Sequence, residues 1–273
     1  MKAAILGSTG YIGAQFSHLY PGSIKPKIDI ADRRAVIGFL DSDKPDVVIN
    51  CAGKTGRPNV DWCETHKMET LRANVTGPLI LLEECLVRNI YLVHMSSGCI
   101  YEGGKGGIGS TEDDPPNFFG SFYARTKIWS DQAMRDFPVL NLRIRMPFDR
   151  SRSERNLIMK LVKYPKVLDA ENSITYLPDF FAVAAQLIHK RKTGTYNVVN
   201  PGVISPYRIM RLYAEIVDQA HHCERLTLDS LPTVVRAGRS NCVLSTAKLI
   251  GEGVALRPVE EAVREALNAL RNS

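Results

Sequence analysis

Four residues of this chain could act together on a carbonyl group. Ser97 and Cys99 follow an apolar, strand-like run, and Tyr123 and Lys127 stand four positions apart in a helix-like segment. Residues at this spacing share one helix face, so a lysine ammonium can lower the pKa of the phenol from its ordinary value of about 10. Such a phenol can give its proton to a ketone oxygen that a serine hydroxyl also binds. Cys99 indicates that reduction is not the only chemistry at this strand end.

A glycine-rich turn separates the first apolar run, residues 3–6, from the first expected helix. Its glycines permit a tight turn, close approach of a phosphate to the backbone, and close packing of helix on strand. In this position the motif predicts a dinucleotide whose pyrophosphate lies at the helix N-terminus, with a purely structural turn as the alternative. The expected cofactor-binding residues of the turn are Gly7, Thr9, Gly10, Tyr11, Ile12 and Gly13.

The end of a second apolar strand, residues 46–50, completes the expected dinucleotide site. Small residues there would let a cofactor lie against the backbone, and Asn74 could hold that region from the following helix. The residues expected beside the cofactor are Cys51, Ala52, Gly53 and Asn74.

The choice of cofactor depends on the segment where a second Rossmann strand ends. An acid there binds the ribose hydroxyls of NAD, and a cation accepts the extra phosphate of NADP. Asp29 is the nearest acid, and the basic residues that outnumber it are Lys25, Lys27, Arg33 and Arg34. The segment therefore favours NADPH, with NADH as the alternative, unless these charges only face solvent.

The order of apolar runs and amphipathic segments predicts an α/β fold built on a doubly wound parallel sheet of the Rossmann type. We expect strands at 3–6, 46–50, 90–97, 139–145 and 195–199, and an irregular second strand at 21–27 because of its two prolines. Expected helices are 11–19, 32–40, 60–88 with a break near Gly77, one carrying Tyr123 and Lys127, 153–163, 179–191 and 206–218. Residues 102–120 form a loop that could fold over a ligand.

The predicted dinucleotide-binding domain covers residues 1–147, with 175–199 returning to it. Residues 148–174 and 200–273 form the predicted smaller C-terminal substrate-binding region.

Composition and charge narrow the class of protein. The chain has 273 residues, 44% of them hydrophobic, and a net charge of +6 whose basic residues are dispersed, so nucleotide ligands explain the charge more simply than nucleic acid does. Six scattered cysteines and the adjacent His221, His222 and Cys223 lack metal-ligand spacing, so no metal site is expected. Without a signal-like start or an apolar run of about 20 residues, we expect a cytoplasmic protein with no membrane contact.

Longer segments carry a more specific resemblance. They are GRPNVDWCE (56–64), GCI (98–100), PNFFGSFY (116–123), RIRMP (143–147), RNLIMK (155–160), NPG (200–202) and RSN (239–241). With the Ser97, Tyr123 and Lys127 set, the chain resembles the extended short-chain dehydrogenase/reductase family. Within it, the chain is most similar to the bifunctional nucleotide-rhamnose synthase/epimerase-reductases of plants, and more distantly to dTDP-4-dehydrorhamnose reductases. The resemblance covers most of the chain.

The resemblance implies 3,5-epimerisation of a nucleotide 4-keto-6-deoxyglucose, followed by reduction at C4 to a nucleotide-L-rhamnose. By analogy Cys99 is the base and Lys160 the acid of the epimerisation, because C3 and C5 both flank the ketone and their protons can be exchanged through an enolate. Without the resemblance, a small buried apolar residue is the more common role of a free cysteine such as Cys99. The expected substrate-binding residues are Arg57, Asn59, Gly98, Asn156 and Arg239, and Pro147 is expected beside the cofactor.

The resemblance also bears on partners. No dehydratase domain accompanies these motifs, so a separate 4,6-dehydratase would supply the nucleotide sugar, and a homodimer through the Tyr123 helix is the family expectation. A short loop after Cys99 and the irregular second strand leave open the sugar, the choice of UDP or dTDP, and the cofactor. Two alternatives stand beside this prediction: a reductase without epimerase activity, and a non-catalytic nucleotide-binding regulatory subunit.

Overall fold

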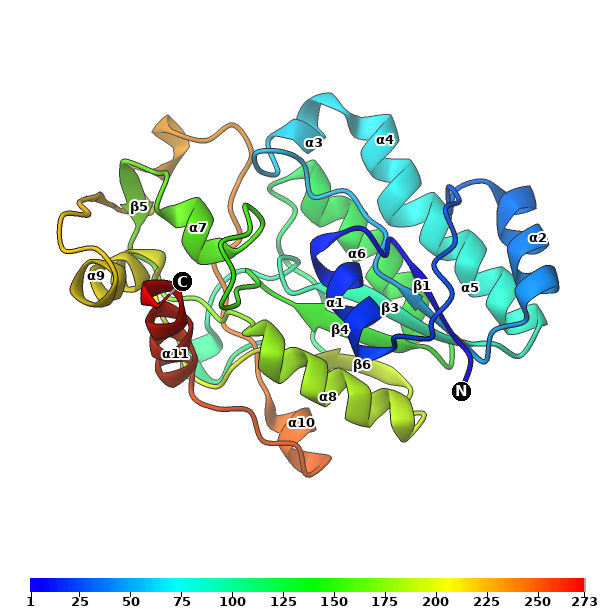
Figure 1. Cartoon of the computed structure of the whole chain (residues 1–273). Helices are drawn as coiled ribbons and strands as arrows, with labels where there is room; N and C mark the ends of the chain where they lie inside the picture. Colours follow the sequence, from blue (N-terminus) through cyan, green and yellow to red (C-terminus); the bar gives the residue numbers. More distant parts are fainter. Residues whose placement is uncertain (273) are drawn as a thin grey trace. The chain divides into compact units, whose positions relative to one another are not determined.

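The computed structural model describes residues 1–272 (Figure 1). Contacts group the chain into two compact units. The first contains residues 1–100, 116–143 and 184–196, and the second contains residues 101–115, 144–183 and 197–273. The division by function that the sequence suggests, 1–147 with 175–199 against the rest, stays a prediction.

The first unit is built on a sheet whose strand order is β1-β2-β3-β4-β6. The strands are β1 (Ala3–Leu6), β2 (Val47–Asn50), β3 (Tyr91–Ser97), β4 (Leu140–Ile144) and β6 (Gly194–Asn197). β1, β2 and β3 pair in parallel, with Leu6 opposite Asn50 and Asn50 opposite His94. All residues of these three strands are buried, which explains their continuous apolar runs. The predicted parallel α/β fold is confirmed.

The irregular second strand is reduced to one bridge. Ile24 pairs with Ala4 through two backbone hydrogen bonds of 2.8 Å, one from Ile5 N–H and one to the Ala3 carbonyl. Pro21 and Pro26 have no N–H to extend the pairing. β1 thus has Ile24 on one side and β2 on the other, so the order of the strands reverses at β1, and ligands of open α/β sheets bind beside the carboxyl end of such a strand.

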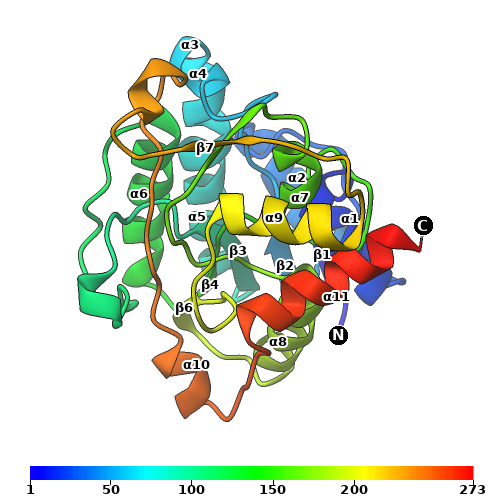
Figure 2. The ribbon, with the colours of Figure 1, turned by 90° about the vertical axis from the view of Figure 1, so that its left-hand side faces the viewer.

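Helices cover both faces of this sheet. α1 (Tyr11–Leu19) lies on one side and α5 (Gly77–Val87) and α6 (Phe122–Arg135) on the other, as Figures 1 and 2 show. α2 (Arg33–Asp43) begins at Asp32, whose carboxylate accepts the N–H groups of Arg34 and Ala35. Alternate strand residues, among them Ala4, Val48 and Leu92, pack with α2, α5 and α6 in one core cluster. The sheet is therefore doubly wound.

The segment predicted as one helix over 60–88 consists of four pieces. They are α3 (Trp62–Thr65), α4 (Lys67–Leu71), a π-helical turn (Arg72–Thr76) and α5. His66, with φ of −121°, separates α3 from α4. At the π turn, Gly77 N–H bonds to the Arg72 carbonyl five residues back, and Pro78 has no N–H for the usual bond to residue 74. The expected break near Gly77 is thus a change of helix type.

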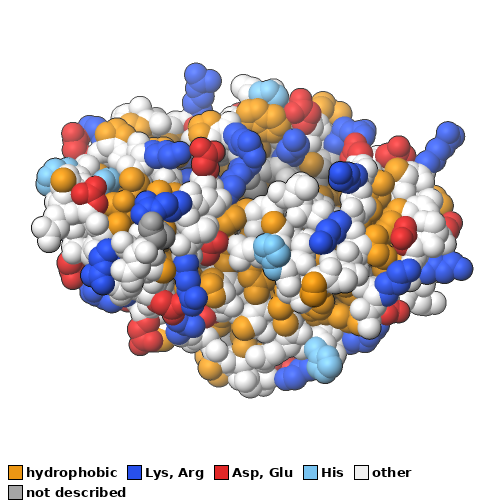
Figure 3. All heavy atoms as spheres, in the orientation of Figure 1, with side chains coloured by type: hydrophobic (Ala, Val, Ile, Leu, Met, Phe, Trp, Pro, Cys, Tyr) orange, Lys and Arg blue, Asp and Glu red, His pale blue; other side chains and the backbone are white. Residues whose placement is uncertain are grey.

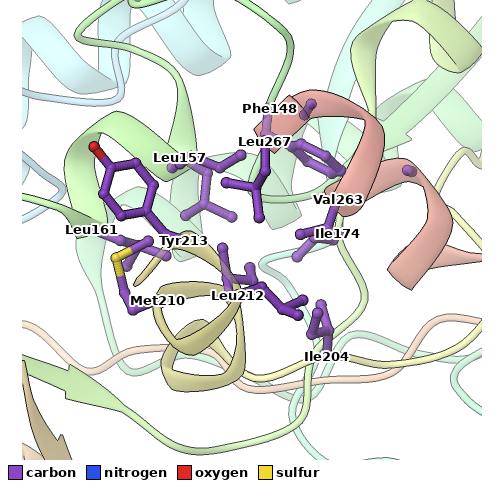
Figure 4. Close-up of a cluster of buried hydrophobic side chains, with 14 of the residues drawn as sticks. Phe148, Leu157, Leu161, Ile174, Ile204, Met210, Leu212, Tyr213, Val263 and Leu267 are labelled. Atoms are coloured by element: carbon purple, nitrogen blue, oxygen red, sulfur yellow. The ribbon is translucent and has the colours of Figure 1, made fainter. Parts of the chain in front are cut away.

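The second unit has a two-stranded parallel sheet and its own core. β5 (Lys166–Leu168) pairs with β7 (Glu224–Leu226). Helix α9 (Pro206–Ile216) packs against β5. The other elements of this unit are α7 (Leu157–Leu161), the first part of α8 (Leu177–His189), α10 (Ala247–Gly251), α11 (Val259–Arg271) and 3-10 turns at Lys105–Gly107 and Leu231–Thr233; residues of α8 from 184 on belong to the first unit. α9 and α11 lie side by side in Figure 2, and Figure 4 shows Met210 and Leu212 of α9 and Val263 and Leu267 of α11 in the buried cluster. β5, β7, α10 and α11 were not predicted from the sequence.

The loop expected to fold over a ligand is anchored within the second unit. Gly103 N–H donates to the Asn241 carbonyl at 2.8 Å, and Ser110 N–H donates to the Val243 carbonyl at 2.8 Å. The Ser245 N–H returns a 2.9 Å bond to the Ser110 carbonyl. These backbone bonds hold residues 103–110 against residues 241–245, so much of the predicted loop is a fixed edge.

The described part of the chain has no helix long and apolar enough to cross a membrane. On the face drawn in Figure 3, Lys and Arg side chains are spread among Asp and Glu rather than gathered in one patch.

Leu267 tests the core of the second unit because it is fully buried in α11. Leu267→Ala leaves a cavity and is expected to lower the free energy of unfolding by about 2 to 5 kcal/mol. Ile250→Ala in α10, where the side chain is 63% exposed, is the matched control and should change it by less than about 0.5 kcal/mol. Urea unfolding followed by circular dichroism measures both, and equal losses would contradict the packing described.

Candidate active site

The serine of the predicted carbonyl site ends strand β3. Ser97 is buried, and its Oγ accepts the Cys99 N–H at 3.1 Å. This bond closes a tight turn over buried Gly98 and holds Cys99 two residues past the strand. In an open parallel sheet, the carboxyl ends of the strands are where ligands bind.

Helix α6 carries Tyr123 and Lys127 without interruption. Its first turn is capped twice: Ser121 Oγ accepts the Ala124 N–H at 3.1 Å, and Glu64 Oε1 accepts the Phe122 N–H at 2.6 Å. Tyr123 is half-buried and Lys127 is buried one turn later. The helical spacing that the sequence predicted is therefore present.

The buried ammonium of Lys127 is held by the strand that carries Ser97. Its Nζ donates to the Met95 carbonyl at 2.9 Å. Burial lowers the pKa of Lys127 to about 8, although the charges of Asp131 and Cys99 act in the opposite direction. Lys127 is thus still mostly an ammonium at neutral pH, and it interacts electrostatically with the Cys99 side chain.

The glycine turn lies against the end of β2. Gly7 has a φ of +71°, and a Cβ built on it would stand 2.7 Å from the Ala52 nitrogen. A Cβ on Gly13 would overlap the Gly7 carbonyl oxygen, and Gly10 N–H bonds to that same oxygen at 2.9 Å. Only glycine fits at Gly7 and Gly13, and no side chain caps the N-terminus of α1. These features fit a dinucleotide whose phosphates approach the backbone.

The end of β2 is held by two asparagines. Asn50 Oδ1 accepts the Ala52 N–H at 3.1 Å, so its Nδ2 donates to His94 Nδ1, at 3.2 Å. Asn74 exchanges two hydrogen bonds with the Lys54 backbone, at 2.8 and 2.9 Å. Asn74 thus holds the segment after Gly53, while the Asn50–His94 pair was missed by sequence reasoning. Its signal was that both residues stand near the ends of adjacent apolar strands.

Within the described part of the chain, some charged residues near the irregular strand form ion pairs with other side chains, and others do not. Asp29 accepts the Ala31 N–H at 2.9 Å and pairs with Arg72 at 3.1 Å, and these contacts, the Ala31 bond first, hold its pKa below the ordinary value. Arg33 is paired with Glu83 at 2.6 Å and with Glu84. No ion pair of Lys25, Lys27 or Arg34 is seen within residues 1–272. Of the basic residues expected to bind a phosphate, these three therefore keep their charges available.

Comparison with known proteins places these features in a family. The model of the RmlD substrate binding domain family matches residues 1–272. The chain belongs to the RmlD family. A bifunctional dTDP-4-dehydrorhamnose 3,5-epimerase/dTDP-4-dehydrorhamnose reductase from Arabidopsis thaliana is 37% identical over 95% of this chain and 90% of that protein. The resemblance inferred from the motifs is confirmed.

Two other RmlD relatives are similar over nearly the whole chain. A crystal structure of a UDP-rhamnose synthase from Acanthamoeba polyphaga mimivirus is 32% identical, covers 98% of this chain and 99% of that one, and superposes with a TM-score of 0.93. A trifunctional UDP-glucose 4,6-dehydratase/UDP-4-keto-6-deoxy-D-glucose 3,5-epimerase/UDP-4-keto-L-rhamnose-reductase from Arabidopsis thaliana is 35% identical over 96% of this chain. The chain spans 41% of that larger protein.

Some expected site residues of this RmlD chain belong to the second unit. They are Pro147, Asn156, Lys160 and Arg239. Burial, with the nearby charge of Arg155, lowers the pKa of Lys160. Arg239 is half-buried and donates to the Ala237 carbonyl at 2.8 Å, and the Pro147 carbonyl accepts the Leu157 N–H at 3.1 Å.

Asn156 has a structural use that the sequence did not indicate. It caps α7 by accepting the Ile158 N–H at 3.1 Å, and its amide donates to Asp149 and to the Ser151 carbonyl. These bonds occupy its polar atoms and give no support to a substrate contact. In the first unit, Asn59 Oδ1 accepts the Asp61 N–H at 2.9 Å, and Arg57 is exposed.

Gly13 gives a direct test of the dinucleotide turn. Gly13→Ala forces the turn to move because its Cβ would overlap the Gly7 carbonyl oxygen. We expect the Kd for NADPH to rise at least about tenfold, which corresponds to about 1.4 kcal/mol. Gly22→Ala is the control, since a Cβ there meets nothing within 4 Å. Isothermal titration calorimetry measures both, and unchanged binding by a folded Gly13→Ala protein would refute the assignment.

Proposed function

We propose that this protein is an NADPH-dependent reductase that acts on the C4 ketone of a nucleotide 4-keto-6-deoxyhexose. The observation that carries the proposal is the arrangement of Ser97, Tyr123 and Lys127 in the unit that also contains the glycine turn. RmlD membership and the printed activities of the relatives support a sugar-nucleotide substrate.

In the proposed reduction the protein moves one proton. The hydride that C4 receives would come from NADPH when it is bound. Tyr123 gives its hydroxyl proton to the oxygen on C4, which Ser97 binds by a hydrogen bond. Lys127 favours loss of that proton because its ammonium lies on the same helix face as the phenol. The ketone becomes an alcohol, and the phenol is restored from solvent.

The same ketone permits an epimerisation before reduction. Removal of the proton on C3 or C5 gives an enolate whose oxygen Ser97 and Tyr123 can stabilise, and return of a proton on the other face inverts the carbon. We assign the base to Cys99, which Ser97 holds at the same strand end. We assign the acid to Lys160, whose pKa burial lowers from its ordinary value, so that its ammonium releases a proton more readily. The names of both plant relatives include a 3,5-epimerase.

The product would be a nucleotide-linked L-rhamnose. The relatives act on different nucleotides by name, dTDP in one and UDP in the others, so both belong to the proposed substrate class. The trifunctional relative includes a dehydratase and this chain spans 41% of its length. We propose a 4,6-dehydratase reaction, of the kind that the name of this relative includes, as the source of the 4-keto sugar.

Deuterium incorporation tests the two half-reactions separately. The protein is incubated in heavy water with a nucleotide 4-keto-6-deoxyglucose, first alone and then with NADPH. We expect deuterium at C3 and C5 by NMR in both experiments, and oxidation of NADPH in the second. If no deuterium enters C3 or C5 but NADPH is oxidised with the already epimerised sugar, the protein is a reductase without epimerase activity. Binding of NADPH with no turnover of either epimer would leave a regulatory subunit.

Cys99→Ala separates the epimerase from the reductase in the same assay. Loss of the base should slow exchange at C3 and C5 by about two to four orders of magnitude, while reduction of the already epimerised sugar stays within about threefold. Cys223→Ala is the matched control, because that cysteine is also half-buried and directly precedes β7 in the sequence. Tyr123→Phe should abolish reduction. Normal exchange by Cys99→Ala would remove Cys99 from the mechanism.

The preference for NADPH rests on the basic residues near the irregular strand. Asp29 is engaged by Ala31 and Arg72, and Arg34 carries an available charge at the start of α2. Arg34→Ala is expected to raise the KM for NADPH about tenfold, because the extra phosphate loses a cation. The KM for NADH is the internal control and should stay unchanged. A parallel rise in both constants, or none, would contradict the assignment.

A further inference from the structure

A buried carboxylate lies one helical turn beyond Lys127. Asp131 of α6 is fully buried and accepts four hydrogen bonds from two neighbouring strands. Arg143 donates Nη2 to Oδ1 at 2.6 Å and Nε to Oδ2 at 3.0 Å. Ser96 Oγ donates to Oδ2 at 2.6 Å, and Asn141 Nδ2 donates to Oδ2 at 2.9 Å. This cluster was not predicted from the sequence, although Asp131 stands four residues after Lys127.

These bonds connect the reactive elements to one another. Ser96 directly precedes Ser97, and strand alternation turns the two side chains to opposite faces of the sheet. The Ser96–Asp131 bond therefore fixes the end of β3, which also supplies the Met95 carbonyl that binds Lys127. Asn141 and Arg143 stand two residues apart on β4 and reach the same carboxylate. One side chain thus joins β3, α6 and β4.

The charge of Asp131 also acts on Lys127. Burial alone would raise the pKa of Asp131, but its bonds to Arg143, Ser96 and Asn141 together hold it below the ordinary value, so it is a carboxylate at neutral pH. Of the two charges that oppose the effect of burial on Lys127, Asp131 contributes more than Cys99.

The other groups around Lys127 come from β3 and from its own helix. Burial, and then the Lys127 charge, keep the pKa of His94 well below its ordinary value, so this imidazole is neutral. Met95 presents a carbonyl, Tyr123 precedes Lys127 by one turn, and Cys99 follows β3. Arg143 reaches the region through Asp131, whose carboxylate it binds at both oxygens.

We propose that Asp131 is a positioning residue of the reductase site, which keeps Lys127 charged and fixes the end of β3 that carries Ser97. This role rests on the proposed function for its consequence in catalysis. Its physical content, the support of the Lys127 charge by a buried carboxylate, does not depend on turnover.

The test removes the carboxylate without leaving a buried unpaired cation. A protein labelled with ¹³C at lysine Cε is titrated by NMR, and Lys127 is identified by the resonance missing from Lys127→Arg. In the double variant Asp131→Asn/Arg143→Gln, we expect the Lys127 midpoint to fall by about one pH unit or more, because an anion near the ammonium is gone. Asp136→Asn, at the exposed end of the same helix, should leave the midpoint in place.

The single variant Asp131→Asn is a second measurement, in which the titration midpoint of Lys127 should also fall. A midpoint within about 0.3 units of the wild type in either folded variant would overturn the proposal, because a merely structural role leaves Lys127 unaffected. If neither variant folds, Asp131 is a folding residue and the proposal is also overturned.

Kinetics distinguish this result from a failure of the proposed function. If the reductase assignment holds, the alkaline limb of the pH profile of kcat/KM should move down with the Lys127 midpoint. A shifted midpoint in a protein that reduces no 4-keto sugar would support the role of Asp131 and refute the reductase. An active enzyme with an unshifted midpoint would do the reverse.

Discussion

The parallel register of β1, β2 and β3 is the constraint on which the site depends. Leu6 lies opposite Asn50, and Asn50 lies opposite His94, so β1 and β2 end level with each other and β3 continues past them to Ser97 at the same edge of the sheet. Gly7 follows the first strand at once, and its approach to Ala52 leaves no room for a side chain. A slip of one residue would turn every side chain to the opposite face. The dinucleotide turn and the reactive serine therefore share one geometric origin.

Burial of charge is the second condition for this site. Taking an ammonium out of water is costly, and the protein compensates Lys127 with a strand carbonyl and a carboxylate one turn away. That carboxylate is itself buried, and Arg143 with two polar neighbours satisfies it. Asp131, Arg143, Ser96 and Asn141 thus form one hydrogen-bonded cluster. Loss of either charged residue would leave the other charge buried without a compensating partner.

The sequence was sufficient for the features that depend on local spacing. The parallel sheet, the irregular second strand at 21–27 and the helix that carries Tyr123 were predicted from apolar runs, prolines and glycines. Features that depend on distant contacts were missed. β5 and β7 are three residues each and pair across more than fifty residues, and Asp131 meets Arg143 only because α6 packs on β4. Asn156 has a helix-capping role that the motif did not indicate, and its predicted contact with the substrate stays a prediction.

The turn after β3 explains how two reactions could use one ketone. Ser97 Oγ accepts the Cys99 N–H, so the residue proposed to bind the oxygen on C4 also fixes the backbone of the proposed base. C3 and C5 are the carbons next to C4, and a base that reaches them must stand beside the group that binds the C4 oxygen. Cys99 stands only two residues after Ser97, and the 3.1 Å hydrogen bond between them keeps the proposed base next to the group that binds the C4 oxygen. A reductase needs only Ser97 at this turn, so Cys99 is the residue of the turn that points to epimerisation as well as reduction.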